Sequence, residues 1–137
     1  MDLEQPLAGQ RLGAYTVLSL LGGGGTGIVY RARDEKLGRE VAMKILHAGL
    51  LADAAQRSRF QREARALAAL NHQNIGAIYA IEEIEGASAL VLELVDGPTL
   101  AEQLEKGPLS VCETLKLARQ IADALEAAHR RCAATSR

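Results

Sequence analysis

The pattern of apolar and polar positions predicts a strand-rich first part of the chain. Residues 15–21, 28–33 and 39–46 are short runs rich in aliphatic and β-branched side chains. A glycine cluster separates the first two runs, and the charged segment 34–38 separates the second from the third. Runs bounded in this way are typical of β-strands. Because the connections are tight, the three strands are expected to form an antiparallel meander.

The pattern then becomes helical before it returns to strands. Phe60, Ala64 and Leu67 recur at helical spacing within residues 53–70, and a polar stretch over 71–74 ends the helix. Two more strands are predicted over 75–82 and 89–94, around a turn at Glu85 and Gly86, and Asp96-Gly97-Pro98 ends the sheet. The first part is therefore predicted to be a five-stranded antiparallel sheet with one helix.

Two helix-start signals follow the sheet. Thr99-x-x-Glu102 and Ser110-x-x-Glu113 both match the capping box, in which the two side chains bond reciprocally to backbone N–H groups. The last helix is predicted from Val111 to about His129, with one apolar stripe formed by Val111, Leu115, Ala118, Ile121 and Leu125. Residues 1–14 are interpreted as a polar lead-in. Residues 130–137 show no periodic pattern of apolar residues.

Composition narrows the class of protein. The 137 residues are 48% hydrophobic with a net charge of −1, which fits one small aliphatic-cored domain or a piece of a larger one. We therefore expect no binding of nucleic acid and none of anionic membranes. Cys112 and Cys132 match neither a disulfide framework nor zinc spacing. No signal peptide or membrane-spanning run is visible, so a cytoplasmic protein is expected.

The glycine cluster is the first candidate site. Gly22, Gly24 and Gly27 form G-x-G-x-x-G, in which residues without Cβ let backbone N–H groups approach phosphate oxygens. The same motif occurs in dinucleotide-binding folds, where it opens a helix. Here it precedes the predicted strand 28–33, which disfavours a dinucleotide-dependent oxidoreductase. A glycine-enriched hairpin without a ligand is the plainer alternative.

Two charged side chains stand where burial is expected. Lys44 lies inside the apolar run V-A-M-K-I-L, and Glu63 lies between Phe60 and Leu67 on its helix. An unpaired buried charge is costly, so an ion pair between Lys44 and Glu63 is the favoured interpretation. The alternative leaves Lys44 at an edge with its charged end in water, and Glu63 at the rim of its apolar stripe.

Several segments in this order resemble the amino-terminal lobe of a bacterial, eukaryotic-like serine/threonine protein kinase. They are L-G-G-G-G-T-G-I-V-Y-R-A-R-D, V-A-M-K, F-Q-R-E, L-N-H-Q-N-I, L-V-L-E-L-V-D-G-P-T-L and A-R-Q-I-A-D-A-L-E-A-A-H. The resemblance implies an α+β fold with an ATP-binding lobe over 15–95. It also implies a hinge exit and the first two helices of an incomplete second lobe over 96–129, with 130–137 outside the family.

The resemblance also implies a role for each matching residue. Gly22, Gly24 and Gly27 would cover the phosphates of ATP, and Lys44, paired with Glu63, would hold them. The adenine would lie among Leu21, Val29 and Ala42. Leu92 would be the gatekeeper, and the segment from Glu93 to Val95 would be the hinge. The family uses magnesium with ATP, and it transfers the γ-phosphate to serine or threonine.

The printed sequence contains neither H-R-D nor D-F-G, which supply the family's general base and magnesium ligands. We therefore expect no phosphotransfer by this chain alone and an ATP dissociation constant of about 1 mM or weaker. We expect the ending to reflect a frameshift, a premature stop or an incomplete gene model. The alternative function is a non-catalytic module that docks on a full-length kinase through Val111, Leu115, Ile121 and Leu125.

Overall fold

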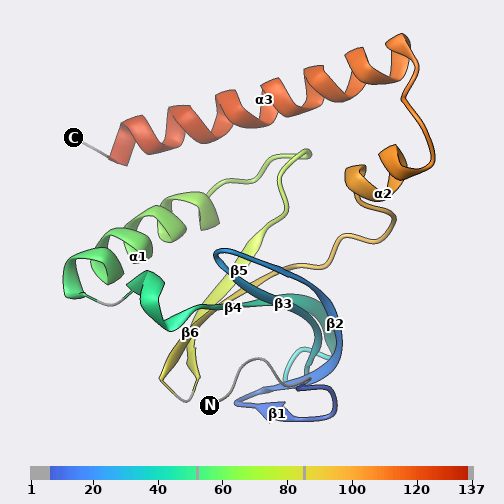
Figure 1. Ribbon diagram of the computed structural model, residues 1–137. Coiled ribbons are helices and arrows are strands. Elements are labelled where there is room, and N and C mark those ends of the chain that lie inside the picture. The colour runs from blue at the N-terminus through green and yellow to red at the C-terminus, as the bar shows by residue number, and fades with distance from the viewer. Residues whose placement is uncertain (1–6, 52, 85, 136–137) are drawn as a thin grey trace.

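The structure is a computed structural model that describes residues 7–51, 53–84 and 86–135. The start of the lead-in (1–6), Glu85 of the predicted turn, and the last two residues of the predicted tail lie outside the described residues. The described parts form a curled antiparallel sheet with one helix beside it and two further helices after it (Figure 1).

The sheet has six strands in the order β1-β2-β3-β4-β6-β5, and all neighbours are antiparallel. The strands are β1 (Arg11–Leu12), β2 (Tyr15–Gly24), β3 (Gly27–Asp34), β4 (Arg39–Leu46), β5 (Ile78–Ile84) and β6 (Ala87–Glu93). The structure confirms the antiparallel, kinase-like sheet that the sequence predicted. The strand β4 has the predicted bounds.

The strand count of five was wrong because the lead-in contributes β1. Arg11 and Leu12 pair with Thr16 and Tyr15 of β2. Leu7 and Leu12 are each only 2% exposed, so their burial in the core holds this short segment against the sheet. A strand of two residues is too short to show an alternating pattern, which explains why the sequence did not predict it.

One face of the curled sheet carries the hydrophobic core. On β4, Val41, Met43 and Ile45 are buried, and Met43 lies opposite Tyr30 of β3 and Val91 of β6. Since side chains alternate along a strand, Ala42 and Lys44 project from the other face. The packing of the core therefore fixes Lys44 on the opposite face of the sheet.

The helix α1 (Ala54–Ala68) runs beside β5 and begins at Asp53, whose carboxylate accepts a hydrogen bond from the N–H of Gln56 at 2.7 Å. A short 3-10 turn (Ala48–Leu51) connects β4 to it. Only Ala64 of α1 is fully buried. The helix contacts β5, α3 and the 3-10 turn, but it buries little of its own surface, since Phe60 and Leu67 are only half-buried.

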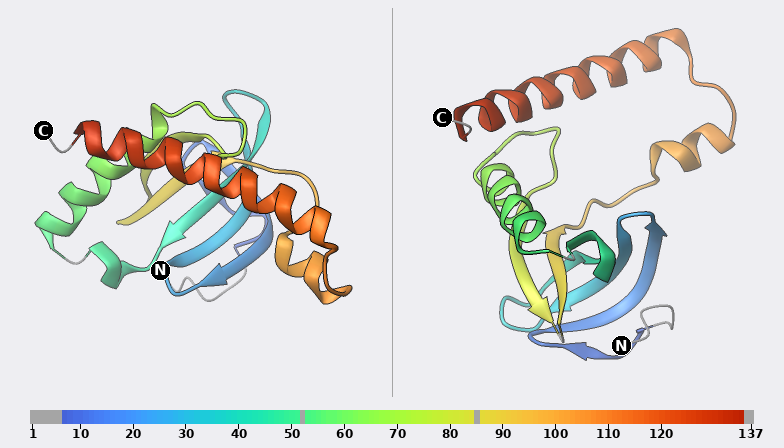
Figure 2. Two further views of the ribbon diagram at one scale, coloured as in Figure 1. Left: turned by 90° about the horizontal axis from the view of Figure 1, so that it is seen from above. Right: turned by 60° about the vertical axis from the view of Figure 1, so that its left-hand side comes forward.

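The two last helices lie away from the sheet. The short α2 (Leu100–Glu105) leads to α3 (Val111–Thr135), which crosses above the end of α1, as both views in Figure 2 show. Both predicted capping boxes are present, since Thr99 and Glu102, and Ser110 and Glu113, bond reciprocally. None of the described helices is both long and apolar enough to span a membrane.

The predicted end of the last helix near His129 was wrong, because α3 continues to Thr135. The added residues are arginine, cysteine, alanine and threonine, with no glycine or proline to stop a helix. An ion pair between Arg130 and Glu126, one turn apart, supports the extension. A helix can continue without an apolar period where its residues have good helix propensity.

Candidate nucleotide-binding site

The glycines form the tip of the β2–β3 hairpin. Gly24 pairs with Gly27, and Gly25 and Thr26 make the turn between them. Beneath this hairpin lies an open hollow of about 380 Å³. Its walls are Leu21, Gly22, Gly23, Gly24, Thr26, Gly27, Val29 and Lys44. The structure thus brings six of the predicted residues together and adds Gly23 and Thr26, which spacing alone did not single out.

Gly27 is the glycine whose lack of a side chain is most strictly required. It pairs with Gly24 on one side and with Leu46 of β4 on the other. A Cβ built on it would lie 2.2 Å from the carbonyl oxygen of Ile45, and its φ is +152°. At Gly24, in contrast, a Cβ would meet nothing within 4 Å. The backbones of β3 and β4 therefore approach each other closely at Gly27, whereas there is free space beside Gly24 at the tip of the hairpin.

The face of the sheet that carries Lys44 also carries the predicted adenine-site residues. Lys44 lies opposite Val29 on β3 and Leu90 on β6, and Ala42 lies opposite Leu92. The pairing places Ala42 and Leu92 one cross-strand step from Lys44, on the same face. The hollow below the glycines therefore opens onto the face where the sequence predicted the base to bind.

The expected ion pair between Lys44 and Glu63 is not formed in this structure. Glu63 instead pairs with Arg59, one turn earlier on α1, with Arg59 Nε 2.8 Å from Glu63 Oε1. The Glu63 side chain is 57% exposed, so it does not have the buried position that its place between Phe60 and Leu67 suggested. The hydrogen bond that Arg59 donates to the Glu63 carboxylate raises the pKa of Arg59. Lys44 makes no ion pair with any residue in the described ranges.

Helical geometry explains the difference. Glu63 lies at the edge of the stripe that includes Ala64, and a partner four residues earlier on the same helix is always within reach. A partner on β4 becomes available only if α1 approaches the sheet closely, and the single buried residue of α1 does not draw it there. A sequence pattern gives the helix face but not the helix position.

The predicted hinge begins where β6 ends. The N–H of Glu93 donates to the carbonyl of Ala77 at 2.8 Å, and the N–H of Ala77 donates to Glu93 Oε2 at 2.9 Å. Glu93 is thus tied to the loop before β5 by backbone and side chain together. Val95 is 71% exposed. The carboxylate of Glu93 has a structural use that the sequence did not indicate.

The loop after α1 is joined to α3 behind the hinge. Asn74 donates from Nδ2 to the carbonyl of Gln120 at 3.3 Å, and the guanidinium of Arg131 donates to the carbonyl of Ala69 at 3.2 Å. His72 accepts the N–H of Asn74 at its Nδ1, 3.1 Å away. This bond helps to shape the loop that carries Asn74.

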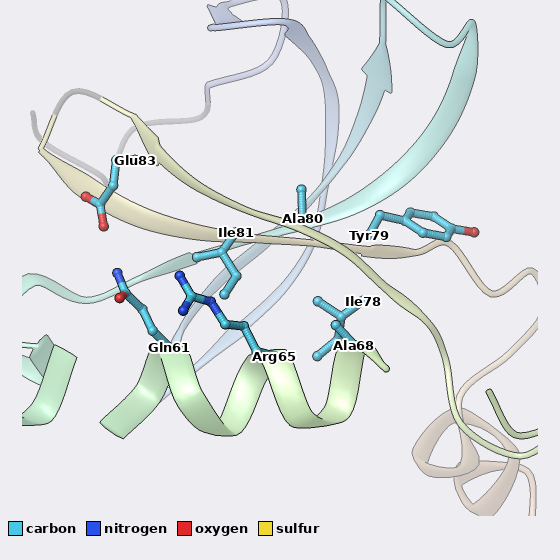
Figure 3. A pocket seen from close by; sticks show the side chains of 8 residues that line it. All are labelled: Gln61, Arg65, Ala68, Ile78, Tyr79, Ala80, Ile81 and Glu83. Atoms are coloured by element: carbon cyan, nitrogen blue, oxygen red, sulfur yellow. The ribbon is translucent and has the colours of Figure 1, made fainter. Parts of the chain in front are cut away.

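A second hollow, of about 330 Å³, lies between α1 and β5 (Figure 3). Figure 3 shows Gln61 and Arg65 on the helix facing Ile81 on the strand. The full lining is Gln61, Arg65, Ala68, Ile78, Tyr79, Ala80, Ile81 and Glu83. It holds none of the residues predicted to bind ATP.

The described residues offer no ready site for a metal ion. In the ranges 7–51, 53–84 and 86–135, no group of three or more His, Cys, Asp or Glu side chains is arranged to hold one. None of the residues that line the hollow under the glycines carries a carboxylate, the side chain that most often holds Mg²⁺ beside a phosphate. The hollow is lined by four glycines, which carry no side chain over the backbone, and by one lysine, a combination that suits an anionic ligand such as phosphate.

A curled antiparallel sheet with a glycine-rich hairpin, a lysine on the next strand and one helix at its edge is a protein-kinase-like amino-terminal lobe. Comparison with known proteins agrees. The chain belongs to the protein kinase family, because the family model described as "Protein kinase domain" matches residues 15–134. The matched range includes residues 130–134, within the segment that we expected to lie outside the family.

Similar proteins are bacterial serine/threonine kinases. The chain is 42% identical over 125 residues to the serine/threonine-protein kinase PrkC of Bacillus subtilis, covering 90% of this chain and 19% of PrkC. It is 43% identical over 134 residues to a probable serine/threonine-protein kinase, SCO3848, of Streptomyces coelicolor, covering 93% and 20%. The crystal structure of the Mycobacterium tuberculosis PknI kinase domain is similar, with a TM-score of 0.78 at 31% identity.

The chain spans about a fifth of the length of these two curated relatives and 51% of the solved PknI kinase domain. The structural alignment with the PknI kinase domain includes 90% of the residues of this chain. The chain is thus similar to one part of a serine/threonine kinase domain.

Proposed function

We propose that this chain binds the triphosphate of ATP under its glycine hairpin, as the nucleotide-binding lobe of a serine/threonine protein kinase. The hollow lined by Leu21, the hairpin glycines, Val29 and Lys44 is the observation that carries the proposal. Its chemistry suits an anionic ligand, because it combines glycines, which leave the backbone uncovered, with a lysine that has no ion-pair partner among the described residues.

Binding by this chain alone is expected to be weak. The hollow is open, so a bound nucleotide would keep much of its surface in water. We expect a dissociation constant of about 1 mM or weaker, which corresponds to about 4 kcal/mol of binding free energy. Adenine would lie along Ala42 and Leu92, with the hinge backbone from Glu93 to Val95 as its hydrogen-bonding edge.

A titration of the 137-residue protein with ATP, followed by NMR chemical shifts, tests this proposal. The Lys44→Ala variant should not saturate at any accessible ATP concentration, because it removes the cation that the phosphates would meet. Lys36→Ala is the matched control, since Lys36 lies in the turn between β3 and β4, away from the hollow. Equal binding by Lys44→Ala and the wild type would refute the proposed site.

We further propose that these 137 residues do not transfer phosphate by themselves. The printed sequence has no H-R-D or D-F-G, and a general base alone contributes about 10²–10⁴ in rate. A radiolabelled γ-phosphate assay with a generic protein substrate should give no signal above that of Lys44→Ala. Incorporation clearly above this background would show that the chain supplies its own catalytic groups.

A second candidate function is docking on a full-length kinase through α3. The residues that favour it are large, apolar and exposed on this helix: Val111 (77% exposed), Leu115 (65%), Ile121 (51%) and Leu125 (53%). Exposed apolar side chains at helical spacing form a surface that a partner could cover. This surface does not involve the glycine hairpin, so the two functions can be tested separately.

Co-purification with a full-length bacterial serine/threonine kinase tests this second function. Leu115→Glu combined with Ile121→Glu should abolish the association, because it places two charges in the contact. Leu37→Glu is the control, since Leu37 is equally exposed, at 65%, but lies in the β3–β4 turn. Loss of association in the control as well would indicate a nonspecific effect.

A further inference from the structure

The side chain of His47 reaches the tip of the glycine hairpin from the neighbouring strand. His47 directly follows Leu46, the last residue of β4, and its Nε2 lies 3.1 Å from the carbonyl oxygen of Gly24. Leu46 pairs with Gly27 of β3, which in turn pairs with Gly24 of β2. The imidazole therefore spans the end of β3 and joins β2 to the residue that follows β4. Because a carbonyl can only accept, Nε2 must carry the proton.

The direction of this bond matters for a phosphate-binding loop. Such a loop must present N–H groups to the ligand and turn its carbonyl oxygens aside, since their partial negative charge repels phosphate. His47 does not line the hollow under the glycines; it lines a separate small one with Leu51 and Arg57. The carbonyl that bonds to His47 is thus directed out of the phosphate hollow.

We propose that His47 is a positioning residue for the glycine hairpin. It holds the Gly24 carbonyl away from the phosphates and ties the hairpin tip to β4, the strand that carries Lys44. The inference rests on the proposed function for its effect on ATP, whereas its effect on the hairpin itself is independent of any ligand. His47 is exposed, so water competes for the bond. The expected gain in ATP affinity is accordingly small, about twofold to fivefold.

The test compares three variants of the 137-residue protein. His47→Ala removes the donor, His47→Gln restores one through its amide, and His129→Ala removes an exposed histidine of α3 as a control. In the nucleotide-free wild type, long-range NMR spectra of the imidazole should show a protonated Nε2. In His47→Ala, the amides of Gly24 and Gly25 should lose order on the ps–ns timescale.

Ligand titrations complete the test. His47→Ala should weaken ATP binding by about twofold to fivefold, with recovery in His47→Gln and no change in His129→Ala. Adenosine, which has no phosphates, should bind His47→Ala and the wild type equally. A wild-type imidazole protonated only at Nδ1, or a His47→Ala variant with unchanged hairpin order, would overturn the inference. Absence of any ATP binding by the wild type would refute the proposed function, while the tautomer and the hairpin order would still decide the role of His47.

Discussion

At the scale of single residues, the same type of residue has different roles at neighbouring positions. Gly27 is confined between two strands, with the carbonyl of Ile45 where a Cβ would stand, whereas Gly24 has free space around it. Only the first is required for folding of the hairpin. The second is available for the ligand, because its open surroundings let phosphate approach the backbone.

This contrast makes a direct prediction. Gly27→Ala should destabilise the protein by about 1–3 kcal/mol, because the backbone of β3 must move away from β4 to admit the methyl group. Gly24→Ala should cost much less, since nothing lies within 4 Å of the added atom. Urea unfolding of both variants measures the difference. Equal loss of stability in the two would contradict the close approach at Gly27.

The charged residues show what a sequence can and cannot predict at this scale. The sequence correctly placed Lys44 on a strand beside the glycines, because alternation along V-A-M-K-I-L fixes its face. It did not predict that Glu63 would bond to Arg59, since the choice between a partner on the helix and one on the sheet depends on the position of α1. His47 was missed because nothing in its local pattern indicates a contact with Gly24.

At the scale of elements, the sequence predicted those helices and strands that depend on residues close together in the chain. It missed features that depend on packing against distant parts of the chain. The strand β4 and both capping boxes follow from residues a few positions apart, and the structure contains them as predicted. The short strand β1 and the extension of α3 to Thr135 were missed. The first depends on burial of Leu7 and Leu12 in the core, and the second on helix propensity without an apolar period.

The capping boxes predict a dependence of helicity on pH. Hydrogen bonds from Thr99 and from Ser110 hold the pKa of Glu102 and of Glu113 below the ordinary value of 4.5. Since the folded pKa is the lower one, the two carboxylates stabilise their helices above about pH 4.5 and lose this effect as the pH falls further. Far-UV circular dichroism should show the loss of helicity.

A double variant separates this effect from general acid unfolding. Glutamine can also complete a capping box but does not titrate, so Glu102→Gln with Glu113→Gln should keep its helicity at neutral pH and lose less on acidification. Glu105→Gln, a change in α2 outside the box, should behave as the wild type does. An unchanged acid response in the double variant would show that the capping carboxylates are not its source.

At the scale of the whole molecule, the sheet and the last helix differ in how completely they are covered. The core of the sheet is closed, with Val17, Val41 and Met43 fully buried. The helix α3 contacts the loop after α1 through Asn74 and Arg131, and it leaves its apolar side chains exposed. Because the lobe has its own closed core, the hollow under the glycines does not depend on whether a partner covers α3.

We propose that this lobe receives the phosphates of ATP between the glycine hairpin and Lys44. The most direct measurement maps the backbone amides of the 137-residue protein whose NMR signals shift on titration with ATP. We expect shifts at Leu21–Val29, at Lys44 and at the hinge from Glu93 to Val95, with none along the exposed side of α3. No shift at the glycines, or shifts confined to the hollow between α1 and β5, would contradict it.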